Sequence, residues 1–300
     1  MPAFSVCLVN MASNSAIKDI SRVAVVGGGF MGSGIAESTA VSGLPVTIFE
    51  ADPARRPGVT ERIGKSLARA VKGGKMDQEA MDAALARITI ADDLAEIGDT
   101  DLVVEVVPED LELKLKVMAE IEKAVSDEAI VASNTSSIPI AELAGPFRHP
   151  ERVCGLHFFA PVPVMKLVEI VVALDSSEST IQAARDFVKT IGKRPIETKD
   201  RSGFVVNMLL VPYLMAGVRM YEEEFATPED IDEGMRLGCG HPMGPLELCD
   251  FIGLDVLYSV CDSLYEEFKR DEYAPPPILK RMVASGRFGR KSGRGFYEYE

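Results

Sequence analysis

The stretch that decides the fold is Arg22-Val-Ala-Val-Val-Gly-Gly-Gly-Phe-Met-Gly-Ser-Gly-Ile-Ala36. Residues 23–26 are β-branched or small and predict a short buried strand. The glycines that follow have the spacing G-x-G-x-x-G, at Gly27, Gly29 and Gly32. In such a turn the first glycine allows the tight change of direction, the second lets a pyrophosphate approach the backbone, and the third lets the helix pack closely on the strand. Because the helix N-terminus also offers free N–H groups to phosphates, the stretch predicts a dinucleotide site.

An acidic residue further along the chain indicates which dinucleotide binds. Residues 46–50, Val-Thr-Ile-Phe-Glu, predict a second strand that ends in Glu50, about 20 residues after the glycines, where a ribose-binding carboxylate is expected. A carboxylate at this position repels a 2′-phosphate, so NAD is favoured over NADP as the cofactor. The alternative is a glycine-rich turn that binds no ligand.

Composition narrows the class of protein. The chain has 300 residues, for which two domains are expected, and 47% of them are apolar, which is enough for a packed core. A net charge of −14 argues against nucleic acid as the main partner. No apolar run is long enough to span a bilayer, so no membrane partner is expected. The five scattered cysteines and three separated histidines favour reduced thiols, a cytoplasmic location and no metal site.

One segment, residues 54–75, departs from the acidic balance. It carries a single acid, Glu61, and seven basic residues: Arg55, Arg56, Arg62, Lys65, Arg69, Lys72 and Lys75. Four of these are three or four residues apart and line one face of a predicted helix, namely Arg62, Lys65, Arg69 and Lys72. The face is either solvated or a landing site for a polyanion beside the cofactor. Coenzyme A or an acidic carrier protein would fit such a site.

Up to about residue 200, predicted strands and helices alternate. After the first two strands, further strands are expected at 88–90, 102–107, 129–132, 153–159, 165–172 and 194–198, with helices at 76–87, 111–125 and 181–191. This alternation predicts an α/β fold, a Rossmann-like doubly wound sheet with helices on both faces. Ligands bind beyond the carboxyl ends of the strands in such sheets, which is where the polar run at 133–137 lies.

Two strands of this sheet are expected to bring a histidine and a carboxylate together. Pro161 and Pro163 stand between the runs 153–159 and 165–172 and suggest a turn that joins neighbouring strands. Such a turn could place His157 beside Glu169.

From Phe204 onward there is little strand signal. Helices are expected at 205–224, from 228, and at 245–251, 254–270 and 277–285. We therefore divide the chain into an extension at 1–19 that is expected to be disordered, a NAD-binding domain at 20–200, and an all-helical substrate and dimerisation domain at 201–300. The apolar helix from Val205 packs either within the chain or against a second subunit, and a homodimer is expected.

A series of motifs in order carries a resemblance. They are Val-Gly-Gly-Gly-Phe-Met-Gly at 26–32, Ala-Ser-Asn-Thr-Ser-Ser at 132–137, Gly-Leu-His-Phe-Phe-Ala-Pro-Val-Pro-Val-Met-Lys-Leu-Val-Glu at 155–169, Gly-Phe-Val-Val-Asn at 203–207, His-Pro-Met-Gly-Pro at 241–245 and Phe-Gly-Arg-Lys-Ser-Gly-Arg-Gly-Phe-Tyr at 288–297. The chain resembles the short-chain L-3-hydroxyacyl-CoA dehydrogenases, including the 3-hydroxybutyryl-CoA dehydrogenases. The resemblance runs from about Ile20 to Glu300.

The resemblance implies a reversible, NAD-dependent oxidation of an L-3-hydroxyacyl-CoA to a 3-oxoacyl-CoA in fatty-acid or butanoate metabolism, with a short chain such as 3-hydroxybutyryl-CoA. His157 is implied as the general base, a role that suits the pKa of histidine, and Glu169 as the residue that orients it. Ser136 and Asn207 are implied near the substrate oxygens, where donors stabilise developing charge. Without the resemblance, these two would be interpreted as a turn hydroxyl and a helix-capping amide.

The resemblance also implies the contacts with cofactor and substrate. The implied cofactor contacts are Gly27, Gly29, Phe30, Met31, Gly32, Glu50, Glu109, Lys114, Ser136 and Lys291. Coenzyme A is implied at Ser66, and at Lys72 or Lys75, because the family's lysine falls at Gly73 here. Solvated surface charges are the alternative for Glu109, Lys114 and Lys291. Ala160 departs from the family, which often has asparagine at this position.

Other functions stay open at this point. A related dehydrogenase would act on units bound to a carrier protein, or on a free sugar acid such as gulonate. A protein from another class would bind NAD without catalysis, as crystallins with this fold do. The sequence does not determine the acyl chain length, although apolar residues of the helix from Val205 could form the floor of a pocket for a short or medium acyl chain.

Overall fold

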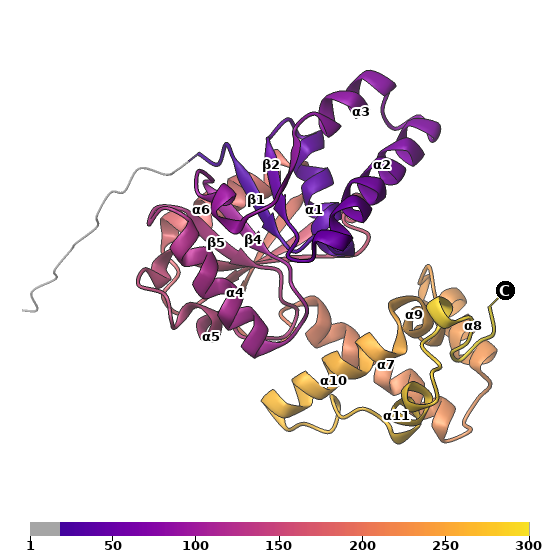
Figure 1. The fold of residues 1–300 in the computed structure, drawn as a ribbon. Helices are drawn as coiled ribbons and strands as arrows, with labels where there is room; N and C mark the ends of the chain where they lie inside the picture. The colour runs from indigo at the N-terminus through magenta and orange to yellow at the C-terminus, as the bar shows by residue number, and fades with distance from the viewer. Residues whose placement is uncertain (1–18, 300) are drawn as a thin grey trace, which may run out of the picture.

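The computed structural model describes residues 19–299, which form a sheet-containing part and a helical part (Figure 1). The extension predicted at 1–19 lies, except for its last residue, outside the described residues. No helix of the described chain is long and apolar enough to cross a membrane.

The first part is built on one eight-stranded sheet with the order β3-β2-β1-β4-β5-β6-β7-β8. All neighbouring strands are parallel except β6 and β7, which are antiparallel. The predicted doubly wound fold is confirmed, and each expected strand ends within a residue or two of its predicted bounds. The strands are β1 (Val23–Val26), β2 (Val46–Phe49), β3 (Ile88–Ala91), β4 (Leu102–Glu105), β5 (Ile130–Ser133), β6 (Val153–Phe158), β7 (Leu167–Val172) and β8 (Arg194–Lys199).

Helices cover both faces of this sheet. Val23 and Val25 of β1 join the core on the face of α1, α2 and α6, and Ala24 and Val26 join the core on the opposite face, with α4 and α5. Because these strands are buried on both faces of the sheet, their sequences are continuously apolar. The helices are α1 (Phe30–Val41), α2 (Arg56–Lys72), α3 (Gln78–Leu85), α4 (Leu111–Ala124), α5 (Ile140–Ala144) and α6 (Glu178–Thr190), with short 3₁₀ turns at Pro53–Arg55, Leu94–Ile97 and Pro150–Arg152.

The sequence does not predict α5. The carboxylate of Asp200 accepts the N–H groups of Ile140 (2.8 Å) and Ala141 (2.7 Å) and so caps this short helix. Because the cap comes from a residue 60 positions away, no local pattern signals it.

The second part of the described chain is helical, as expected. It consists of α7 (Val206–Glu222), α8 (Pro228–Cys239), α9 (Pro245–Ile252), α10 (Leu254–Phe268), α11 (Pro277–Ala284) and a 3₁₀ turn at Arg290–Ser292. Its core includes Leu214, Leu246 and Leu257. The division into a NAD-binding domain at 20–200 and a substrate and dimerisation domain at 201–300 stays a prediction.

The last described residues, 288–299, form a hook that two buried carboxylates hold. Asp250 accepts the N–H groups of Phe296 (3.0 Å) and Tyr297 (2.9 Å) and the hydroxyl of Tyr299 (2.9 Å). The hydroxyl of Tyr297 donates to Asp232 at 2.8 Å. These bonds tie the hook to α8 and α9.

Candidate active site

The three motif glycines occupy the positions that the sequence predicts for them. Gly27 has φ +115°, and a Cβ there would lie 2.6 Å from the carbonyl oxygen of Val106. A Cβ on Gly32 would lie 1.8 Å from the carbonyl oxygen of Gly27. A Cβ on Gly29 would meet no atom within 4 Å. Gly27 and Gly32 are therefore required by turn geometry and packing, whereas Gly29 borders open space at the start of α1.

The carboxylate of Glu50 closes this loop from the end of β2. It accepts the N–H groups of Gly28 (3.0 Å) and Asp52 (3.1 Å). Phe30 and Met31 open α1, and 61% of the Phe30 surface is exposed. Glu50 thus lies beside the predicted phosphate site, where the sequence places the ribose carboxylate.

Arg62 departs from the expected basic face. Its Nη1 atom donates to the carbonyl oxygen of Gly28 and to the hydroxyl of Ser33, both at 2.9 Å. The sequence pattern groups Arg62 with Lys65 and Lys72, and all three residues are exposed in the structure, but the guanidinium group of Arg62 also braces the glycine loop. Arg62 lies 34 positions from Gly28 and 29 from Ser33 in the sequence, so helical periodicity alone does not reveal these contacts.

His157 and Glu169 lie side by side, as predicted. They are paired residues in the register between antiparallel strands β6 and β7, and Nδ1 of His157 lies 2.6 Å from Oε2 of Glu169. Because a carboxylate only accepts hydrogen bonds, Nδ1 carries a proton, and in the neutral imidazole this tautomer leaves Nε2 without one. Glu169 is fully buried, and its Oε1 atom accepts the N–H groups of Val205 and Val206 at 3.0 Å each.

Two aromatic rings restrict the imidazole further. The ring of His157 is 4.5 Å from that of Phe159 and 5.4 Å from that of Phe204, measured between centroids. The residue is 6% exposed. The imidazole is thus held in one orientation at the carboxyl end of β6, the ligand-binding edge of the sheet.

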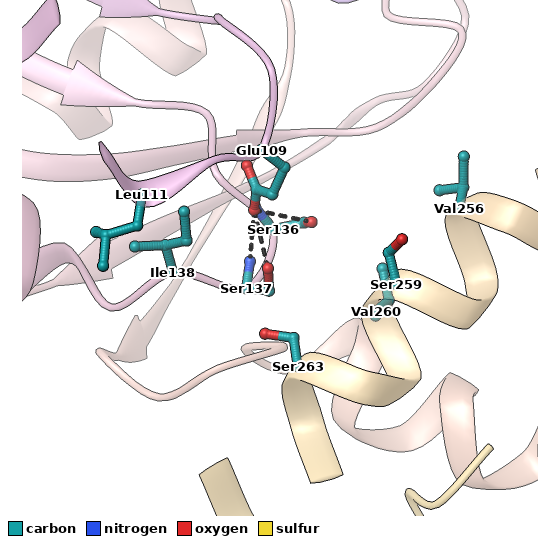
Figure 2. Close-up of a pocket in the computed structure, with 9 residues that line it drawn as sticks. All are labelled: Glu109, Leu111, Ser136, Ser137, Ile138, Val256, Ser259, Val260 and Ser263. Atoms are coloured by element: carbon teal, nitrogen blue, oxygen red, sulfur yellow. Dashed lines mark hydrogen bonds between the residues drawn. The ribbon is translucent and has the colours of Figure 1, made fainter. Parts of the chain in front are cut away.

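The loop after β5 is held by one carboxylate, that of Glu109. Its Oε1 atom accepts the hydroxyl of Thr135 (2.6 Å), the N–H groups of Ser136 (2.9 Å) and Ser137 (3.1 Å), and the hydroxyl of Ser137 (2.9 Å). Figure 2 shows Glu109 above Ser136 and Ser137. Burial raises the pKa of Glu109, but the charge of Lys114 and these hydrogen bonds outweigh burial, and the pKa lies below its ordinary value. Glu109 is an ionised anchor of the loop, although 37% of its side chain is exposed.

Lys114 is buried beneath this anchor and is only 1% exposed. Its ammonium group donates to Glu105 (2.8 Å) and to the carbonyl oxygen of Val107 (3.1 Å), and lies 3.4 Å from Glu109. Glu105 also accepts the hydroxyl of Ser133 at 2.6 Å. No motif in the sequence indicates a role for Glu105, although a lone acid in the apolar run 102–107 is a signal that could have revealed it.

Asn207 lies in the first turn of α7, next to the residues that donate to Glu169. The residue that caps α7 is Val205, without a side-chain hydrogen bond, so the alternative of a capping amide for Asn207 is wrong. The hydroxyl of Ser202 donates to the carbonyl oxygen of Ser137 at 2.7 Å. The segment before α7 is therefore hydrogen-bonded both to the loop at residues 134–139, here called the serine loop, and to Glu169, which brings Ser136, His157 and Asn207 to one region.

The remaining implied residues lie apart from His157. The ammonium group of Lys291 pairs with Asp255 at 2.6 Å, at the start of α10. The hydroxyl of Ser66, on α2, donates to Glu37 at 3.0 Å. Lys72 is exposed at the end of α2. Ser66 and Lys72 thus belong to a surface on the side of α1 and α2.

A cavity of about 380 Å³ separates the serine loop from α10. One wall is formed by Glu109, Leu111 and residues 136–138, and Figure 2 shows the facing side chains of α10 across the gap. Those side chains are Val256, Ser259, Val260 and Ser263. No residue of α7 lines this cavity, and an acyl pocket with α7 as its floor stays a prediction.

Comparison with known proteins places both parts of the chain. Residues 22–201 match the family model for the 3-hydroxyacyl-CoA dehydrogenase NAD binding domain, and residues 203–299 match the model for the C-terminal domain. A 3-hydroxybutyryl-CoA dehydrogenase of Mycobacterium tuberculosis is 50% identical over 282 residues, which cover 93% of this chain and 99% of that protein. The human mitochondrial hydroxyacyl-coenzyme A dehydrogenase is 40% identical over 304 residues, 99% of this chain and 97% of that protein.

A solved structure agrees with these matches. The crystal structure of (S)-3-hydroxybutyryl-CoA dehydrogenase from Ralstonia eutropha superposes with a TM-score of 0.90 at 42% identity, and the match covers 94% of this chain and all of that one. Sequence motifs, sheet topology and relatives agree over nearly the whole described chain. The chain belongs to the 3-hydroxyacyl-CoA dehydrogenase family.

Proposed function

We propose that the protein catalyses the reversible NAD-dependent oxidation of an L-3-hydroxyacyl-CoA to the 3-oxoacyl-CoA, with a short-chain substrate such as 3-hydroxybutyryl-CoA, in fatty-acid or butanoate metabolism. The observation that carries the proposal is the buried His157–Glu169 pair, 2.6 Å apart, at the same edge of the sheet as a glycine loop built for a dinucleotide. Membership of the family supports both the cofactor and the reaction.

The residues of the glycine loop fit NAD. The open space at Gly29 and the N-terminus of α1 would receive the diphosphate, with Gly27, Phe30, Met31 and Gly32 forming the loop. A carboxylate has about four acceptor positions, so Glu50 can accept ribose hydroxyls while it holds two N–H groups. Ser136 and Glu109 would lie at the nicotinamide half, with Lys114 holding Glu109 from beneath, and Lys291 would reach the cofactor from the helical part. When bound, NAD supplies the hydride acceptor for C3 of the substrate.

The protein's own side chains handle the proton. Nε2 of His157, unprotonated because Nδ1 donates to Glu169, takes the proton of the 3-hydroxyl group. The imidazolium that forms is stabilised by the Glu169 carboxylate. Ser136 and Asn207 donate to the substrate oxygens, and Glu109 fixes the position of Ser136 through its backbone N–H group. In the reverse direction Nε2 returns the proton.

Two related activities compete with this proposal. A substrate bound to a carrier protein would also bind the basic surface of α2. A free sugar acid such as gulonate would not use that surface. A non-catalytic NAD-binding protein is the alternative from another class.

One experiment separates these alternatives. Reduction of acetoacetyl-CoA is followed by NADH absorbance, with NADPH and free acetoacetate as controls. Turnover with NADH and the CoA ester alone supports the proposal. Turnover of carrier-bound or sugar-acid substrates in its place supports the related activities, and NADH binding without any turnover supports the non-catalytic role.

We further propose a homodimer that forms through the helical part. Leu209, Phe225 and Leu237 are each between 73% and 75% exposed there, and large apolar side chains at the surface favour association. Light scattering is expected to give twice the mass of one chain, and the mass of a single chain would contradict the proposal.

We also propose a cytoplasmic location. The cysteines of the described chain, Cys154, Cys239, Cys249 and Cys261, are all free. Free thiols are typical of a reducing compartment. Cell fractionation tests this location directly.

A further inference from the structure

Two arginines follow strand β2, and their charge conflicts with that of the carboxylate next to the strand. Glu50 favours NAD because a carboxylate there repels a 2′-phosphate, whereas an arginine near this point of a dinucleotide site accommodates the 2′-phosphate of NADP. Arg55 and Arg56 both lie shortly after Glu50 in the sequence and are candidates for that role. The contacts of their guanidinium groups show how the two tendencies are reconciled.

The guanidinium group of Arg56 is fixed by groups of the protein. Its Nε atom donates to the carbonyl oxygen of Glu50 at 2.9 Å, and its Nη2 atom donates to the carbonyl oxygen of Asp92 at 2.9 Å. Its Nη1 atom donates to the carboxylate of Asp92 at 2.5 Å, and only 17% of the side chain is exposed. Arg56 therefore joins the end of β2 to the residue after β3, and it is not free to turn toward a cofactor.

The side chain of Arg55 is 77% exposed and pairs with an acid of the same loop. Its Nε atom lies 3.3 Å from Oδ2 of Asp52. Asp52 is itself held beside Glu50, because its N–H group donates to the Glu50 carboxylate at 3.1 Å and its Oδ1 atom accepts the N–H group of Ala54 at 2.9 Å. Asp52 therefore adds a second negative charge next to Glu50 and neutralises the more exposed of the two arginines.

These charges act at the 2′ position of the ribose. When the ribose hydroxyls donate to Glu50, a phosphate on the 2′ oxygen lies next to Glu50 and close to the side chains that follow on the loop. A phosphate monoester carries a charge of about −1.5 to −2 at pH 7, so both carboxylates repel it. We infer that Asp52 is a second determinant of the preference for NAD, because it adds its charge to that of Glu50 and withholds Arg55 from a 2′-phosphate. This inference rests on the proposed function.

The test compares the dissociation constants of NADH and NADPH, measured by titration of the nicotinamide fluorescence. Asp52→Asn keeps an oxygen for the N–H group of Ala54 but removes the charge. Because exposed charges have modest effects, it is expected to strengthen NADPH binding about three- to tenfold relative to NADH. Adding Arg55→Ala to this variant is expected to remove most of the gain, since the released guanidinium group is then absent.

Asp77→Asn is the matched control. Asp77 caps α3 in the same way, accepting the N–H group of Ala80 at 2.8 Å. It follows the far end of α2, whose 17 residues span about 25 Å, and this distance exceeds the Debye length of about 8 Å at physiological ionic strength. The ratio of the two dissociation constants is therefore expected to equal that of the wild type.

The outcomes separate the inference from the proposed function. If the wild-type protein binds NADH but reduces no CoA ester, the proposed function fails, while the binding ratios still test the role of Asp52. If it reduces acetoacetyl-CoA with NADH but Asp52→Asn leaves the ratio of the dissociation constants unchanged, the inference alone is overturned. It is also overturned if the double variant keeps the whole gain, because Arg55 would then have no part in the discrimination.

Discussion

Replacing Glu169 by glutamine separates two tasks of one carboxylate. Oε2 faces Nδ1 of His157 at 2.6 Å, and Oε1 accepts the N–H groups of Val205 and Val206 at 3.0 Å. All of these partners donate, whereas a glutamine side chain has one acceptor oxygen and one NH₂ donor. Its nitrogen must therefore face either the histidine or the start of α7.

Magnitudes decide between these two orientations. With its nitrogen toward α7, glutamine would leave the N–H groups of Val205 and Val206 without an acceptor, at about 1–3 kcal/mol each. With its nitrogen toward His157, both backbone bonds persist and the histidine only has to move its proton from Nδ1 to Nε2. The second orientation costs less. We expect the free energy of unfolding to fall by about 1–3 kcal/mol, because a neutral acceptor replaces a charged one.

The same orientation removes the base. Nε2 then carries a proton and cannot take one from the substrate hydroxyl. The comparable tautomer change in the triad of serine proteases lowers kcat about 10⁴-fold, so we expect about 10³–10⁴-fold here for oxidation of 3-hydroxybutyryl-CoA. The dissociation constant for NADH should not change, since Glu169 is not in the glycine loop.

The assay combines steady-state kinetics with urea unfolding. Glu142→Gln is the matched control, since Glu142 is exposed and the exchange is the same. A Glu169→Gln protein whose kcat stays within tenfold of the wild type would refute the tautomer argument.

Three further predictions concern the base, the glycines and the loop anchor. His157→Gln should retain NADH binding in fluorescence titration and lose about 10²–10⁴-fold in kcat; unchanged turnover would remove His157 from the mechanism. Gly29→Ala should fold normally but weaken NADH binding, because its Cβ points into open space, whereas Gly32→Ala should lose about 3 kcal/mol or more of stability, because its Cβ would overlap Gly27; equal thermal stability of the two variants would contradict this. The pKa of Glu109 is lower in the folded protein than its ordinary value of 4.5, so the unfolded chain binds more protons below that value and the stability contributed by Glu109 is lost as pH falls from 4.5 through the folded pKa. Urea unfolding from pH 6 to 3.5 should show a steeper loss for the wild type than for Glu109→Gln, and parallel curves would argue against it.

Local patterns predicted much of the fold and the centre of the site. Backbone geometry alone explains Gly27 and Gly32, and the turn with two prolines between apolar strands was sufficient to pair His157 with Glu169. The packing of Gly32 on Gly27 and the short turn between β6 and β7 depend on residues close together in the sequence, so their spacing carries the information; the approach of Gly27 to Val106 does not.

Features that depend on long side chains reaching between elements were not predictable. Lys114 lies in the first turn of a helix, where a lysine is usually exposed, yet its ammonium group is buried against Glu105 and Glu109. The cap of α5 likewise comes from a distant residue, Asp200, which lies 60 positions further along the chain. The lining of the cavity by α10 also depends on how the helices pack, which their periodicity does not give.

The C-terminal hook limits how much of the protein can fold while the ribosome is still synthesising it. The donors to Asp250 and the tyrosine hydroxyl that reaches Asp232 lie 46 to 65 residues further along the chain. Until residues 296–299 have left the ribosome, a nascent helical part would have to bury both carboxylates without these donors, which is unfavourable. The strands and helices up to Lys199 have no such dependence on these residues. We expect the sheet to be able to form during translation, and the helical part to lock only after the hook has emerged.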